Sequence, residues 1–537
     1  MLHRSTTPSS AWPLSGRAAR PGLLAVAGLL SLCPTFQLSG QQRSAYEELQ
    51  TFSGVLNHIR TNYVDSVTYT ELVRAAIDGV LHALDPHSSF FSRREWERRS
   101  ALERGELAVT GLYIEEVDSA TTVLAVAPKS PAARAGILPG DRLVMVNDTS
   151  IAGLEVRAIE LRLAGERGAK VRLQFERGLR LEPDSFSVTI KRDFLELHSV
   201  ANVRMADSIT GYLRLEEFRL KAAEEVHDAL KQLRGKGMRR AILDLRGNPG
   251  GLVVSAVELA SEFFPKGTVV FRTHGRKREL DTTYVTRHDG DFRELPLVVL
   301  IDEHSASAAE ALAGSLQDHD RALLLGRRSF GKALMQADFL VLPLGDDLHL
   351  TIGYVVSPSG RYIQRRYRGL AVEQYRSFAG KSGAEQDTLT VFRTDHGRPV
   401  RGGGGIVPDV PLPPPAPLPV WWTAASDSGF WEAVSDSVAL TLPVDPAARR
   451  GWLTAPGQWH AKLLPPFLAR VRTRLHVTAQ TDSVLDARLG RILAARAAEV
   501  RWGPEAYEEF LLRASPDVQA AITYFPRLQE LLALPPN

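Results

Sequence analysis

Cysteine is almost absent from this chain of 537 residues, which contains only Cys33. A single cysteine cannot form an internal disulfide, and it excludes a zinc site built from several cysteine ligands. Cys33 also lies inside the segment that we interpret below as an export signal. We therefore expect neither disulfides nor a cysteine nucleophile in the mature protein.

The sequence also lacks an excess of charge of one sign. Its 65 basic and 62 acidic side chains leave a net charge of +3, which gives no reason to expect nucleic acid as a partner. The zinc-protease string His-Glu-x-x-His does not occur, and spacing makes none of the 14 histidines a convincing triad base. For Asp85-Pro86-His87 we favour a loop cap at a helix end over a catalytic role. No metal or organic cofactor is expected.

Long hydrophobic runs are missing from the sequence after residue 40. In that part of the chain, no segment contains 18 or more consecutive apolar residues. The run Gly22–Leu32 follows Arg4, Arg17 and Arg20, and a basic segment before a short apolar one is the pattern of an export signal. We predict that residues 1–40 are a signal peptide, with an uncleaved membrane anchor as the alternative. The protein is then extracytoplasmic, in the periplasm, and either soluble or anchored to the inner membrane.

Residues 41–107 are predicted to be a helical region. Apolar residues recur at helical spacing in Tyr46–Asn62 and in Tyr69–Leu84, and Asp85-Pro86 ends the second helix. We interpret this region as an arm for packing or dimerisation, so a homo-oligomer is one possible assembly.

Residues 108–192 alternate short β-like runs with turn signals, which predicts a small β-barrel. Two helices are expected within it, at Pro131–Ala135 and Leu154–Leu163. The predicted strands are Val123–Val126, Arg142–Val146, Val171–Phe175 and Phe186–Ile190.

Residues 193–365 alternate strands with helices, which predicts βαβ units and a largely parallel sheet, and so a multidomain α/β fold whose core domain extends over residues 193–411. Residues 366–400 have weak periodicity and are interpreted as an insertion. Active sites in such sheets gather at the carboxyl ends of strands. We interpret Gly402–Gly405 and the Pro-rich stretch after it as a hinge, and residues 412–537 as a linker followed by a helical region from Pro466 to Leu534. The predicted core strands are Ala241–Leu245, Leu297–Asp302 and Ala322–Leu325, and the predicted helices are Lys221–Leu233, Leu252–Phe264 and Ala308–Gln317.

Ser307 stands between an apolar strand and a helix, where backbone N–H groups converge and the helix dipole favours negative charge. That environment stabilises the oxyanion of a tetrahedral intermediate. The alternative is structural, because Ser307-x-x-Glu310 is also a helix capping box.

Lys332 follows the next strand of the predicted sheet, so strand order brings it toward Ser307. A neutral lysine can take the proton of a serine nucleophile. Burial near Phe330 and Leu334 would have to destabilise the ammonium form by roughly 4 kcal/mol. The alternative is a solvated surface lysine.

A glycine-rich loop follows a third strand, at Asp244–Gly251. Glycines let the backbone approach a substrate and turn an N–H toward it. A phosphate-binding loop would end in Gly-Lys-Ser/Thr, which is absent, so we favour an oxyanion-hole loop.

Taken together, these motifs resemble the C-terminal processing peptidases, or tail-specific proteases, a serine peptidase family with a Ser/Lys dyad and a PDZ domain. The resemblance runs from about residue 46 to 411 and implies a core related to the ClpP and crotonase folds, with an inserted PDZ domain at 108–192. The matching stretches are Asn62–Asp65, Leu84–Ser89, Ser130–Ala132, Ala135–Asp141, Asp244–Gly251, Ser305–Glu310, Gly326–Gln336, Ser357–Arg361 and Gly405–Asp409.

The resemblance implies a role for each matching catalytic residue. Ser307, not Ser305, matches the nucleophile, Lys332 the general base, and Gln336 a residue that orients the lysine. His304 and Ala309 depart from the family pattern, which commonly has glycine and serine there.

The resemblance also implies backbone sites. The Ala308 N–H and one N–H of Gly250-Gly251 match the oxyanion hole. Gly111-Leu112-Tyr113-Ile114 matches the PDZ loop and strand that receive a terminal carboxylate by strand addition.

The implied function is an exported serine endopeptidase that cleaves proteins or peptides with free C-termini near those termini. One alternative is a peptide-binding scaffold without turnover, against which Ser307 and Lys332 argue. A second is an acyl-CoA hydratase-like enzyme, which rests on fold analogy alone. In the PDZ domain, the alternative to carboxylate capture is a packing wall.

Overall fold

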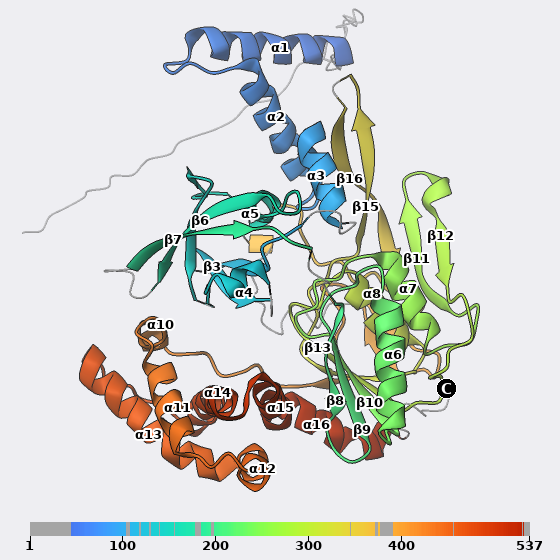
Figure 1. The fold of residues 1–537 in the computed structure, drawn as a ribbon. Coiled ribbons are helices and arrows are strands. Elements are labelled where there is room, and N and C mark those ends of the chain that lie inside the picture. The colour runs from blue at the N-terminus through green and yellow to red at the C-terminus, as the bar shows by residue number, and fades with distance from the viewer. Residues whose placement is uncertain are drawn as a thin grey trace, which may run out of the picture. The chain divides into compact units, whose positions relative to one another are not determined.

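The computed structural model describes residues 44–103, 108–117, 120–127, 130–138, 140–154, 156–177, 184–194, 198–343, 345–370, 374–375, 390–454, 456–528 and 530 (Figure 1). The predicted export signal lies outside the described residues. The chain divides into two compact units, one up to Arg74 and one from Ala75. Within the described ranges, no helix is long and apolar enough to cross a membrane.

The first unit contains α1 (Ala45–Asn62) and the first turns of α2 (Tyr69–Leu84), the two helices that the sequence predicts. α1 begins with a reciprocal cap, because the Glu47 N–H donates to Ser44 Oγ and the Ser44 N–H donates to the Glu47 carboxylate. No residue of α1 is buried.

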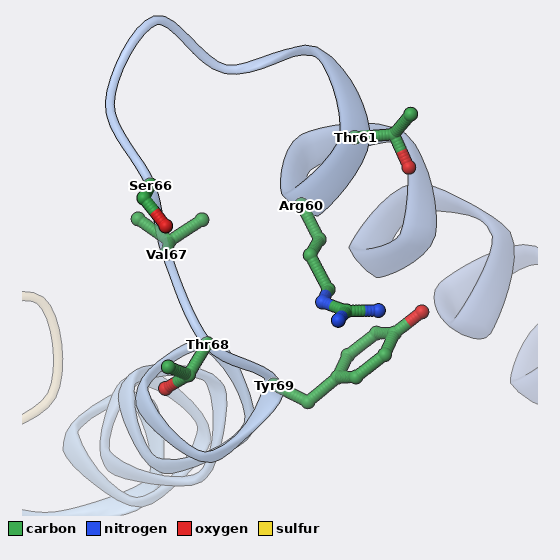
Figure 2. A pocket seen from close by; sticks show the side chains of 6 residues that line it. All are labelled: Arg60, Thr61, Ser66, Val67, Thr68 and Tyr69. Carbon is green, nitrogen blue, oxygen red and sulfur yellow. The ribbon is translucent and has the colours of Figure 1, made fainter.

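A polar pocket of about 470 Å³ lies at the corner between α1 and α2. Figure 2 shows the Arg60 guanidinium over the ring of Tyr69, 4.6 Å from its centroid. The Tyr69 hydroxyl donates to Asn57 Oδ1 at 2.9 Å, which also ties the two helices together. The pocket is lined by Arg60, Thr61, Ser66, Val67, Thr68 and Tyr69.

In the second unit, residues 108–192 form a six-stranded antiparallel sheet with α4 (Pro131–Arg134) and α5 (Val156–Leu163). Side chains alternate along its strands, so that Val171, Leu173 and Phe175 are buried. The strand order is β2-β3-β4-β6-β7, with β5 on β4. The bounds are β2 (Leu112–Val117), β3 (Ala120–Val126), β4 (Arg142–Val146), β5 (Thr149–Ser150), β6 (Lys170–Arg177) and β7 (Asp184–Lys191).

The largest core surrounds a six-stranded sheet in the order β19-β14-β13-β10-β9-β8, parallel except for β8. This confirms the predicted α/β class. The sequence analysis did not predict β8, β9 or β19. The bounds are β8 (Val200–Met205), β9 (Thr210–Leu215), β10 (Arg240–Asp244), β13 (Leu297–Ile301), β14 (Leu323–Gly326) and β19 (Val410–Pro411).

Both faces of this sheet are buried, as parallel sheets require. One face packs on α6 (Ala222–Gly235), α7 (Val253–Ser261) and α8 (Ala308–Asp318). The other face packs on α15 (Pro504–Ala514) and α16 (Pro516–Tyr524) of the C-terminal region. The sheet residues on that second face are Tyr212, Ile242, Val298, Leu300, Leu323 and Leu325.

A second, antiparallel sheet has the order β1-β16-β11-β12, with β15 also on β16. The sequence analysis missed it: β1 lies in the region predicted to be helical, and three residues are too few to show a period. β1 forms because β16 offers it an edge. The bounds are β1 (Ser89–Phe91), β11 (Val269–Gly275), β12 (Thr282–Val285), β15 (Leu334–Val341) and β16 (Asp346–Val356).

Residues 402–409, the first part of the stretch interpreted as a hinge, are instead packed into the core. The Ile406 side chain is fully buried, and its N–H donates to Ser329 Oγ at 2.6 Å. Asp409 accepts hydrogen bonds from the Leu324 N–H and from Gln317. Gly405 lets its backbone approach that of Ser329 closely and does not provide flexibility, since a Cβ on Gly405 would lie 2.3 Å from Ser329 O.

Beyond this stretch, the C-terminal helices form a core of their own around Phe467, Leu493 and Phe510. The helical prediction from Pro466 holds as far as Leu528, and its end from 531 to 534 lies outside the described residues. It missed three earlier helices and placed the start of α13 too late. The elements are α10 (Val420–Asp427), α11 (Phe430–Thr441), α12 (Pro446–Thr454), α13 (Pro456–Leu475), α14 (Ser483–Trp502), α15 and α16.

Candidate active site

Ser307 lies between the end of β13 and the first turn of α8, as the sequence predicts. Its φ of 57° places it in the left-handed region, which is rare for a residue other than glycine. Such a conformation costs on the order of 1–3 kcal/mol and persists only where the surroundings impose it.

The Glu310 carboxylate links the backbone of Ser307 to that of Lys332. One of its oxygens, Oε2, accepts the N–H of Ser307 at 2.9 Å and the N–H of Lys332 at 2.8 Å. The other, Oε1, accepts Ser329 Oγ and the Gly331 N–H. The helix-cap interpretation is therefore correct for Glu310, and the same carboxylate also joins the two candidate residues.

Glu310 is almost completely buried. Burial raises the pKa of its carboxyl to about 7, although the four donors favour the ionised form and oppose that shift.

Lys332 precedes β15, in the segment that follows β14. Its side chain is half-buried, and its Nζ makes no hydrogen bond to any residue that the structure describes. Burial lowers the pKa of Lys332, and the positive charge of Arg99 lowers it further, while Glu310 and Asp85 oppose the shift. Lys332 is therefore poised toward the neutral form that a general base requires, and it is not a solvated surface lysine.

Gln336 does not hydrogen-bond to Lys332 within the described part of the chain. Its amide donates to Thr351 Oγ1 at 3.1 Å, and that hydroxyl donates to Asp85 at 3.0 Å. The role predicted for Gln336 stays a prediction.

Asp85 is a loop cap, as the sequence analysis favoured. Its carboxylate accepts the N–H groups of His87 and Ser88 and the hydroxyl of Ser88. The same carboxylate raises the pKa of Lys332, so this loop also belongs to the surroundings of the candidate base. Sequence analysis missed that connection, because residues 85 and 332 are far apart in the sequence.

The predicted oxyanion loop lies directly beside Ser307. A Cβ added to Gly250 would come within 2.8 Å of Ser307 Cβ and 3.0 Å of the Ala308 nitrogen. The Gly250 N–H donates to Asn248 Oδ1 at 2.8 Å. The N–H groups of Ala308 and Gly251 have no hydrogen-bond partner among the described residues. Of the paired glycines, Gly251 is therefore the one whose N–H is not already engaged by a described residue.

Ser305 has a structural role that the sequence did not indicate. Its buried hydroxyl donates to Leu245 O at 2.8 Å and accepts the Asp302 N–H. The Ala306 N–H donates to Asn248 O, which ties the same two loops together again. His304 is exposed, and Ala309 is buried in the core beneath the site.

In the β-rich domain, Gly111–Ile114 includes the start of β2, an edge strand of its sheet. Gly111 has φ 86°, and its carbonyl accepts the Ala127 N–H. Ile114 is buried, whereas Tyr113 is exposed. An open edge of β2 offers unpaired backbone groups to an extended peptide.

Comparisons with known proteins assign this arrangement to a family. The model of peptidase family S41 matches residues 209–375, and a PDZ domain model matches residues 122–177. A carboxy-terminal-processing protease of Bartonella bacilliformis is 32% identical over 350 residues, which is 64% of this chain and 78% of that protein. The chain belongs to the carboxy-terminal-processing protease family. It is a serine-type peptidase of protein or peptide substrates.

Other members of the carboxy-terminal-processing protease family show a similar likeness. The carboxy-terminal processing protease CtpA of Bacillus subtilis is 28% identical over 309 residues, 57% of this chain and 65% of that protein. The solved structure of a photosystem II D1 C-terminal processing protease matches with a TM-score of 0.41 and 23% identity, over 72% of this chain and 97% of that one.

Proposed function

We propose that this peptidase acts through a Ser307–Lys332 dyad. The observation that carries the proposal is the single Glu310 oxygen that accepts the N–H groups of both residues. The lowered pKa of Lys332 adds to it, because a neutral amine is needed to remove the serine proton.

In this mechanism, Lys332 Nζ takes the proton of Ser307 Oγ as that oxygen attacks the scissile carbonyl. The N–H groups of Ala308 and Gly251 stabilise the oxyanion that forms. The lysine then protonates the leaving amine, and the C-terminal fragment departs from a Ser307 acyl-enzyme. Water, deprotonated by Lys332, attacks the ester carbonyl, and the lysine returns that proton to Ser307 Oγ as the oxygen leaves.

The direct test is Ser307→Ala, with cleavage of fluorescein-labelled casein as the readout. Ser315→Ala is the matched control, since Ser315 lies on the same helix and its buried hydroxyl has no hydrogen-bond partner among the described residues. We expect no cleavage by the first variant and full cleavage by the second. Persistent cleavage by Ser307→Ala would show that another residue is the nucleophile.

We further propose that Gly111–Ile114 binds the terminal carboxylate of the substrate. Support comes from the edge position of β2 and from α5, which lies against it. The substrate chain would pair with β2 and extend from there toward Ser307.

Export is also a proposal, and it rests on Gly22–Leu32 and the arginines before it. N-terminal sequencing of the mature protein from fractionated cells tests it. We expect a start after residue 32 in the extracytoplasmic fraction, and an intact Met1 on a cytoplasmic protein would contradict export.

A further inference from the structure

The C-terminal region contacts, through one carboxylate, the first residues of the loops that follow β10 and β14. Asp517, in the first turn of α16, lies outside the residues that the family models match. Its Oδ2 accepts Arg246 Nη1 at 2.7 Å and Arg327 Nη1 at 3.3 Å. The three side chains are mostly buried, with relative exposures of 14%, 21% and 16%.

Each of these two arginines stands at the start of a loop that carries a proposed catalytic group. Arg246 is the second residue after β10 and leads to the oxyanion glycine Gly251. Arg327 is the first residue after β14 and leads to Lys332. Asp517 therefore joins two loops that are far apart in sequence.

The same cluster reaches the loop of the nucleophile. Arg327 Nε donates to Glu303 at 2.8 Å, and Glu303 lies in the segment between β13 and Ser307. Asp302, beside it, accepts the Gly247 N–H at 2.9 Å. All three loops that form the proposed site are thus connected at their bases.

Asp517 supplies negative charge where two guanidinium groups converge. Arg246 is also held by Asp244, whose side chain is fully buried, and Arg327 by Glu303. Without the Asp517 charge, the two arginines would face each other across a partly buried space, where like charges repel more strongly than in water. Arg246 could still keep Asp244, and Arg327 could still keep Glu303 and Asp302, so the loops would separate without unfolding.

We propose that Asp517 is a positioning residue for peptide hydrolysis, which holds the oxyanion loop and the lysine loop in register through Arg246 and Arg327. This inference rests on the proposed Ser307–Lys332 dyad. It gives the C-terminal region a part in catalysis that acts through the backbone of the loops, with no contact between Asp517 and the substrate.

The test compares Asp517→Asn, Asp517→Glu and the control Glu509→Gln. Glu509 is well matched, because it lies on the neighbouring helix α15 and also bridges two arginines, Arg449 and Arg513, at 2.8 and 3.0 Å. The kcat and KM for labelled casein are measured for each variant. A fluorophosphonate probe gives the fraction of enzyme that can be labelled and the labelling rate constant.

For Asp517→Asn we expect kcat to fall between about 3-fold and 100-fold with KM changed less than about twofold, because misplaced groups slow the chemical step. The labelled fraction should stay complete while the labelling rate falls. Asp517→Glu should recover most of the loss, and Glu509→Gln should behave as the unaltered enzyme.

Two outcomes overturn the positioning role. One is equal kcat for Asp517→Asn and Glu509→Gln. The other is an Asp517→Asn variant that does not fold, or whose labelled fraction falls at an unchanged rate constant, since Asp517 would then only stabilise the fold. Ser307→Ala in the same assay separates the two proposals: if it still cleaves, the dyad fails, whatever Asp517 does.

Discussion

At the scale of single residues, Glu310 is the group on which the geometry of the site depends. Its carboxylate accepts four hydrogen bonds and donates none. Two of the four donors are the backbone N–H groups of the proposed nucleophile and base. A carboxylate suits this position because both of its oxygens accept and neither donates.

We expect Glu310→Gln to lose at least about 100-fold in kcat and about 3 kcal/mol of stability, because the amide NH₂ would face two buried donors. Urea unfolding and casein cleavage measure the two effects. Glu262→Gln is the control, since Glu262 is also buried but its carboxylate hydrogen-bonds, among the described residues, only to the His227 ring. Equal behaviour of the two variants would show that the Glu310 network is dispensable.

Lys332 should make the activity depend on pH with a definite sign. Only the neutral amine accepts the serine proton, so kcat/KM should rise with pH through the lowered pKa of Lys332. Protonation of Glu310, whose pKa is about 7, removes acceptor capacity and reduces activity on the same, acidic side.

Lys332→Ala and Lys332→Arg should both be inactive at every pH, because guanidinium stays protonated. Rate profiles between about pH 5 and 10 check this. A flat profile, or substantial activity of either variant, is incompatible with a lysine base.

At the scale of elements, the edge position of β2 leads us to predict that the enzyme prefers substrates with a free C-terminal carboxylate. Hydrogen bonds from backbone N–H groups to a carboxylate contribute about 1.5–3 kcal/mol each, so amidation of the substrate C-terminus should lower kcat/KM about tenfold or more. Paired synthetic peptides measure this, and acetylation of the N-terminus is the control for charge.

Removal of residues 108–192 should abolish the difference between the free-acid and amidated peptides. If the intact enzyme cleaves both peptides equally, the domain is a packing wall and the dyad proposal is unaffected.

At the scale of the whole molecule, the C-terminal region completes the core of the peptidase sheet. Leu512, Val518, Ala521 and Phe525 cover apolar side chains of β9, β10, β13 and β14. Burial of each large side chain contributes about 1.5–3 kcal/mol, which together is comparable to the total stability of a domain.

Two adjacent leucines of α15 test this arrangement. Leu512 is 3% exposed and packs on the sheet, whereas Leu511 is 37% exposed. Leu512→Ala should lower the free energy of unfolding by about 2–5 kcal/mol, and Leu511→Ala by less than about 1 kcal/mol. Chemical denaturation measures both, and equal losses would mean that α15 does not depend on the sheet for its packing.

The elements that sequence analysis found are those with a local pattern. The 3.6-residue period of α1 and α2, the alternation of β6 and the buried strands β10 and β13 each follow from side chains close together in the chain. Among the missed elements, β8 and β9 have six residues each, whereas β1 and β19 are only two or three residues long. They exist because another strand supplies their hydrogen bonds.

The sequence by itself determined the α/β class, the family and the candidate residues, because strand-end motifs such as Ser305–Glu310 lie in unbroken stretches of chain. Only the tertiary structure decided how these stretches meet. It placed one Glu310 oxygen between residues 307 and 332, engaged the Gly250 N–H with Asn248, packed a presumed hinge against Ser329, and brought Asp517 to Arg246 and Arg327. The physical reason is that hydrogen bonds and ion pairs depend on distance in space, which the order of residues along the chain does not specify.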